Sequence, residues 1–115
     1  MMEIEVDQEA VHVVGKYCRK TPAEVPIIFE RIAKEWYMRA ANDWFRDKSL
    51  IPKERKIPEK RITKVGISKR TAMNYKIVLK KLGLNEAFLT SWLAWMFINA
   101  FKLKQKGEAS HIKKW

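Results

Sequence analysis

Apolar residues along this chain recur at gaps of three and four, the spacing that places side chains on one face of an α-helix. The longest such face begins after Pro26 and ends near Lys48, and its members are Phe29, Ile32, Ala33, Trp36, Ala40 and Trp44. A shorter face follows Asp7, whose carboxylate can cap a helix, and continues to about Lys20. The pattern therefore predicts a core helix over 26–48 and an amphipathic helix over 8–20.

Two prolines and a cluster of charges mark the segment Ser49–Pro58 as a surface loop within one domain. Beyond this loop we expect a short helix over 59–65. Gly66 and Ile67 then form a turn, and Ser68 can cap the next helix. A short helix, a turn that contains glycine and a second helix make a helix-turn-helix-like segment.

Two more helices complete the expected fold. One runs from Ser68 to Leu82 and ends at Gly83, and the other follows Asn85 to about Gln105. The tail over 106–115 is expected to be frayed or briefly helical. Since no segment shows a strand pattern, we predict an all-α fold, a compact bundle of about five helices in a single domain that covers residues 1–115.

The last helix is apolar enough to raise the question of a membrane span. Ala87 to Phe101 holds no charged residue, but a span needs about 20 apolar residues and this run is shorter, so we predict a buried central helix. The N-terminus lacks the basic start and apolar run of a signal peptide, which predicts a cytoplasmic protein. Because Cys18 is the single cysteine and the two histidines, His12 and His111, are far apart, we expect neither a disulfide nor a metal site.

Positive charge is concentrated in the second half of the chain, whose net charge as a whole is +11. Residues 1–47 hold seven Lys/Arg and nine Asp/Glu, whereas residues 48–115 hold seventeen and four. This division predicts a half that builds the core and a half that meets a polyanion, with nucleic acid as the leading candidate. A solubilising lysine surface is the alternative.

The helix after Ser68 presents the residues from which we predict a nucleic-acid site. Arg70 can bind a guanine edge or a phosphate, Asn74 can pair with adenine, and Lys69 lies beside them. The first backbone amides of the helix, with Ser68 and Thr71, can hold a phosphate. Three preceding cations are expected to extend the positive track: Lys60, Arg61 and Lys64.

Aromatic side chains offer a second mode of binding, the stacking of unpaired bases. Trp92 is a stacking candidate if the leucine stripe of its helix faces the core. Tyr75 is a second candidate, although the stripe on which it lies is apolar. Trp36 and Trp44 are predicted to be core residues.

No arrangement of residues predicts catalysis. The sequence has no glycine-rich phosphate loop, no nucleophile motif and no acidic cluster of the kind that holds magnesium. Asp43 and Asp47 are one helical turn apart, but Arg46 and Lys48 beside them favour a solvated, ion-paired surface. We therefore expect a binding domain that is not an enzyme by itself.

Three segments carry a resemblance to a known family: A-E-V-P-I-I-F-E-R-I-A-K-E-W, I-T-K-V-G-I-S-K-R-T-A-M-N-Y and S-W-L-A-W. Together they make nearly the whole chain similar to the helix-bundle domain of archaeal plasmid primase-polymerases. The resemblance implies one module of a larger replication protein, which binds single-stranded DNA template and initiating nucleotides, ATP among them, with Mg²⁺. It also implies a separate catalytic domain on the same protein that makes the primer.

Two other functions fit the same sequence. A transcription regulator would place the helix over 68–82 in the major groove of duplex DNA, although a single motif specifies no dimer. A protein-interaction domain would place its basic face on an acidic partner and use the aromatic helix as a docking surface. The first predicts a preference for duplex DNA, and the second predicts no length-dependent binding of nucleic acid.

Overall fold

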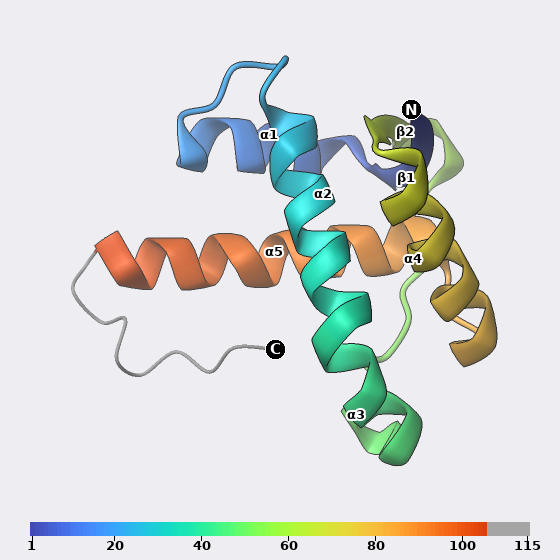
Figure 1. The fold of residues 1–115 in the computed structure, drawn as a ribbon. Helices are drawn as coiled ribbons and strands as arrows, with labels where there is room; N and C mark the ends of the chain where they lie inside the picture. Colours follow the sequence, from blue (N-terminus) through green and yellow to red (C-terminus); the bar gives the residue numbers. More distant parts are fainter. Residues whose placement is uncertain (106–115) are drawn as a thin grey trace.

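The computed structural model describes residues 1–105, with side chains to residue 103, so the prediction for the tail over 106–115 lies outside the described residues (Figure 1). The elements in chain order are β1 (Met2–Asp7), α1 (Gln8–Cys18), α2 (Val25–Glu35), a π-helical turn (Trp36–Ala40), α3 (Ala41–Arg46), a 3₁₀ turn (Lys48–Leu50), a second 3₁₀ turn (Glu59–Arg61), β2 (Ile62–Ile67), α4 (Lys69–Leu82) and α5 (Glu86–Gln105). The predicted helical bundle is confirmed, with a two-stranded sheet added to it.

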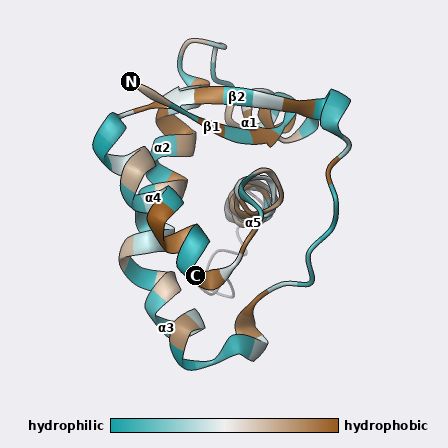
Figure 2. Cartoon of the chain, turned by 90° about the vertical axis from the view of Figure 1, so that its right-hand side faces the viewer, coloured by the Kyte–Doolittle hydropathy of each residue, from teal (hydrophilic) through white to brown (hydrophobic). Residues whose placement is uncertain are grey.

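The helix α5 forms the centre of the fold. Seen along its axis, it has the strands and α1 on one side and α2 and α4 on another (Figure 2). Leu89 and Leu93 are fully buried and Ile98 nearly so, as is typical of a helix that is apolar all round. The prediction of a buried central helix is therefore confirmed, and among residues 1–105 no helix has the length and apolar character to cross a membrane.

The long helix predicted over 26–48 is also confirmed, as α2, the π-helical turn and α3 in direct succession. Its aromatic residues meet others in the core. The ring of Trp36 packs edge-on against Trp44 at a centroid distance of 5.3 Å and against Tyr75 at 5.6 Å. Trp36 and Trp44 are therefore core residues, as predicted.

The prediction that the chain holds no strand is wrong. In β1, Glu3 and Glu5 alternate with Ile4 and Val6, and of these four side chains only the two apolar ones are completely buried. The partner strand, β2, runs antiparallel to β1 from Ile62, which pairs with Asp7, to Ile67, which pairs with Met2. About 60 residues separate the strands, so neither one has a local partner that would reveal it.

The segment 59–82 is consequently not a helix-turn-helix. The helix predicted over 59–65 is a single 3₁₀ turn followed by β2, because the β-branched, alternating residues of Ile62–Ile67 find a partner strand. Gly66 lies in that strand opposite Glu3 and makes no turn between helices. The second helix of the prediction is confirmed as α4, which Ser68 caps and Gly83 ends with a φ of 69°.

Candidate nucleic-acid interface

The side of α4 that faces away from the core combines cations with apolar side chains. Ala72, Tyr75 and Leu79 anchor the helix in the core at spacings of three and four. The opposite side, which we call the α4 face, consists of Lys69, Arg70, Met73, Asn74, Ile77, Lys80 and Lys81. Because Met73 is 44% exposed and Ile77 is 49% exposed, apolar surface lies between the charges.

The cations of the α4 face keep their charge open to external anions. Among the side chains of residues 1–103, no carboxylate forms an ion pair with Lys69, Arg70, Lys80 or Lys81. By contrast, Lys76 on the flank of the same helix is paired with Glu86 at 3.0 Å. The α4 face therefore presents a positive potential on which the phosphates of a nucleic acid can lie.

The N-terminus of α4 already holds a carboxylate. The backbone amide of Ser68 donates to Glu30 Oε1 at 2.8 Å, and the Ser68 hydroxyl bonds to Thr71 Oγ1 at 2.9 Å. Thr71 is buried. Since a phosphate at this end would meet the negative charge of Glu30, we correct the prediction that Ser68 and Thr71 hold one with the helix amides.

Arg61 is engaged in holding the fold together. Its Nε donates to Asp7 Oδ1 at 3.3 Å, and its Nη2 donates to Asp7 Oδ2 and, at 3.1 Å, to Glu9 Oε2. The hydrogen bond to Asp7 raises the pKa of Arg61 above its usual value. Because Asp7 is fully buried, the guanidinium compensates a carboxylate that water does not reach. Arg61 thus stabilises the fold through Asp7, while its side chain stays 42% exposed, and its contact with nucleic acid remains a prediction.

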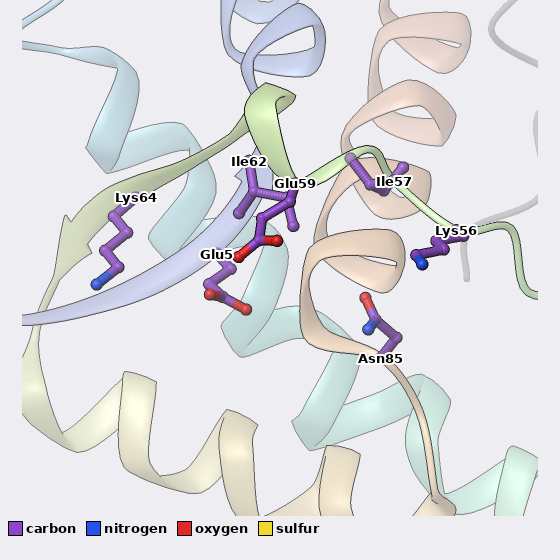
Figure 3. Close-up of a pocket in the computed structure, with 7 residues that line it drawn as sticks. All are labelled: Glu5, Lys56, Ile57, Glu59, Ile62, Lys64 and Asn85. Atoms are coloured by element: carbon purple, nitrogen blue, oxygen red, sulfur yellow. The ribbon is translucent and has the colours of Figure 1, made fainter.

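Lys64 lies on β2 and lines a pocket of mixed charge. Within the sheet it pairs with Glu5. The pocket has a volume of about 460 Å³, and its lining residues are Glu5, Lys56, Ile57, Glu59, Ile62, Lys64 and Asn85 (Figure 3). The two glutamates lie in the middle, with Lys64 on one side and Lys56 on the other (Figure 3). Lys60 is exposed in the 3₁₀ turn that precedes β2.

Tyr75 is a core residue, so the prediction that its ring stacks on a base is wrong. Its side chain is fully buried, and its hydroxyl shares a hydrogen bond of 2.8 Å with Thr90 Oγ1. The apolar stripe on which Tyr75 lies faces inward against Trp36. Burial raises the pKa of the Tyr75 phenol well above its usual value, while the bond to Thr90 acts in the opposite direction.

The buried phenol predicts a loss of stability at alkaline pH. The pKa of Tyr75 in the folded state lies above the value of about 10 for an unfolded tyrosine, so unfolding above that pH releases a proton. We therefore expect this group to leave the free energy of unfolding unchanged below about pH 10 and to lower it above. Urea titrations from about pH 8 to 11 should show a smaller alkaline loss for Tyr75→Phe; equal losses would contradict the assignment.

Trp92 keeps part of its ring accessible. It packs edge-on against Trp44 at a centroid distance of 5.7 Å and contacts the small cluster around Ile57, yet it is only partly buried. A base could reach the open part of the ring without any change in the core. Stacking on Trp92 stays a prediction.

Sequence reasoning missed Lys80 and Lys81. They follow Arg70 by ten and eleven residues, about three helical turns, which places all three on one side of α4. The spacing of these lysines from Arg70 could therefore have predicted their place on the same side of the helix. Glu5, at the pocket, could have been found from the alternation in M-E-I-E-V-D, whereas Glu59 and Asn85 reach the pocket only through tertiary contacts.

Comparison with known proteins found no relative of this chain. No family model matches the chain, and neither a curated protein nor a solved structure matches it. In the described part of the chain, no group of three or more His, Cys, Asp or Glu residues is placed to hold a metal ion. The α4 face and the pocket beside β2 are therefore the candidate binding surfaces of the described residues.

Proposed function

We propose that this domain is a non-catalytic accessory module of a DNA primase and binds single-stranded DNA template through the α4 face. The observation that carries the proposal is the presence of two exposed apolar side chains, Met73 and Ile77, among cations that form no ion pair with the side chains of residues 1–103. Cations attract phosphates of any nucleic acid. Exposed apolar side chains favour unpaired bases, because a duplex stacks its bases inside and offers this surface only phosphates and sugars.

The dimensions of the α4 face suit a short stretch of a single strand. At a rise of 1.5 Å per residue, Arg70 and Lys80 are about 15 Å apart along the helix. A single strand of DNA that lies along α4 would place phosphates near both ends of the α4 face and its bases over Met73 and Ile77. Asn74, partly buried at the edge of the face, is positioned to read one base edge.

The pocket beside β2 supports the second part of the proposal, the binding of an initiating nucleotide such as ATP. Lys56 and Lys64 can neutralise a triphosphate, and Ile57 and Ile62 offer an apolar surface to a base. The two glutamates of the pocket can accept hydrogen bonds from ribose hydroxyls or contact an Mg²⁺ ion that the triphosphate carries. Primer synthesis belongs, in this proposal, to a catalytic primase-polymerase domain of the same cytoplasmic protein.

Fluorescence anisotropy with labelled DNA tests the proposal. A single strand and its matching duplex are titrated at about 150 mM salt, each with and without ATP and Mg²⁺. Tighter binding of the single strand that improves with ATP is the expected result, because two ligands that favour one state strengthen each other. Duplex preference would indicate a regulator instead. Failure to bind either form would exclude nucleic acid as the ligand.

Replacement of one cation of the α4 face is expected to weaken this binding without unfolding the domain. Arg70→Ala removes an exposed guanidinium with no ion-pair partner in the described structure, so we expect about a tenfold loss of affinity and unchanged thermal stability. Arg46→Ala, an exposed arginine at the end of α3, is the matched control and should leave affinity unchanged. Equal effects of the two substitutions would contradict the placement of the site on α4.

A further inference from the structure

One side of α5 is open over part of its length. Along it lie Trp92, Met96, Asn99 and Leu103, which we call the α5 stripe. Met96 is 38% exposed and Asn99 is exposed, while the residues at the two ends of the stripe are partly buried. The C-terminal half of α5 extends beyond α2 on the side away from α4 (Figure 1). The α5 stripe and the α4 face are therefore separate surfaces.

The spacing of the α5 stripe matches a helix–helix seam. Its residues follow one another at four, three and four positions, as a and d residues do in a two-stranded coiled coil. Three of them are apolar, and Asn99 is the single polar member. A second helix laid along α5 would therefore meet a continuous apolar ridge with one amide in it.

Charge indicates what kind of partner fits the α5 stripe. The protein carries a net charge of +11, yet no residue between Ala87 and Phe101 is charged. The next cation, Lys102, places its ammonium 4.0 Å from the ring centroid of Tyr17, on α1. Two copies of this chain repel each other over cationic surfaces but can meet along the α5 stripe. An acidic partner would instead be drawn to surfaces that carry lysine and arginine.

We propose that a second copy of this chain packs against the α5 stripe, with Asn99 of one copy facing Asn99 of the other across a two-fold axis. A carboxamide has both donors and an acceptor, so two such groups related by two-fold symmetry satisfy each other. An apolar partner would leave the amide of Asn99 without a hydrogen bond. A single asparagine in an apolar seam also sets the register of the paired helices. The dimer does not depend on the proposed function.

Sedimentation velocity on the full chain tests the dimer. Without nucleic acid, and over about 5 to 500 µM protein, we expect a concentration-dependent shift from monomer to dimer. Met96→Glu places a charge in the seam and should raise the dissociation constant at least about tenfold. Met73→Glu makes the same change at an exposed methionine of α4 and should leave the dissociation constant unchanged. Circular dichroism establishes that both variants are folded.

Disulfide trapping tests the position of the two-fold axis. With Cys18→Ser as background, Asn99→Cys should give a covalent dimer under a mild oxidant, because facing residues of a helix pair come within reach of a disulfide. Met73→Cys in the same background should stay monomeric. A chain that remains monomeric at all concentrations, or a Met96→Glu variant that associates as the unaltered chain does, would overturn the dimer. Equal trapping at positions 73 and 99 would overturn it as well.

Discussion

Replacement of Asp7 with alanine should lower the free energy of unfolding by about 3 kcal/mol, because a helix cap and an ion pair depend on this one carboxylate. Asp7 is fully buried, and its Oδ1 accepts a hydrogen bond of 2.9 Å from the amide of Glu9 at the start of α1. The same carboxylate accepts two hydrogen bonds from Arg61, in the 3₁₀ turn before β2. Urea denaturation followed by circular dichroism measures the loss.

Glu9→Ala is the matched control for this prediction. Glu9 Oε2 accepts from the same Arg61 Nη2 at 3.1 Å, but the Glu9 side chain is 64% exposed, so we expect a loss below about 1 kcal/mol. Asp7→Asn keeps an acceptor for the helix cap and removes the charge, and it should fall between the two. Equal losses for Asp7→Ala and Glu9→Ala would show that burial of the carboxylate is not what matters.

Reversal of charge at the start of the α4 face should have the largest effect on binding. The double variant Lys69→Glu with Arg70→Glu removes two phosphate contacts and introduces two repulsive ones, so we expect single-strand affinity to fall at least about 100-fold at about 150 mM salt. Both residues are exposed, which should leave the fold intact. Anisotropy titrations at several salt concentrations should also show a shallower dependence of affinity on salt.

A second double variant separates local contacts from the net charge of the protein. Lys16→Glu with Lys20→Glu changes the net charge by the same amount, but both lysines are exposed at the end of α1, which lies away from α4 (Figure 1). We expect this variant to lose less than about tenfold in affinity, since distant charges act mainly through the screened overall field. Equal losses in the two double variants would indicate attraction to the whole protein and no site on α4.

The structure assigns different roles to residues that the sequence grouped together. Lys69, Arg70 and Asn74 lie side by side on α4, as predicted. Lys64 lines a separate pocket beside β2. Three further residues of the predicted site, Ser68, Thr71 and Arg61, form hydrogen bonds within the protein. Residue types that bind phosphate also form helix caps and ion pairs. Which of these roles a residue has therefore depends on the groups that the fold brings next to it.

The sequence alone determined the features of this protein that depend on neighbours within a few residues. Helix α4 begins after Ser68 and ends at Gly83, and α5 begins after Asn85, because capping side chains and a left-handed glycine act over one helical turn. The sequence also predicted the apolar face of α2 and the burial of α5. The outward position of Arg70 followed from the same period.

Tertiary structure alone decided the features that depend on residues far apart in the chain. The strand Ile62–Ile67 exists because β1, about 60 residues earlier, supplies its hydrogen-bond partners; by itself the segment was taken for a helix. Arg61 is occupied because Asp7 is brought to it, and Glu30 is placed at the start of α4 in the same way. The open side of α5 also became visible only once the other elements had covered the rest. Local sequence determines a helix and its caps, but contacts between residues that are far apart in the chain depend on the tertiary fold.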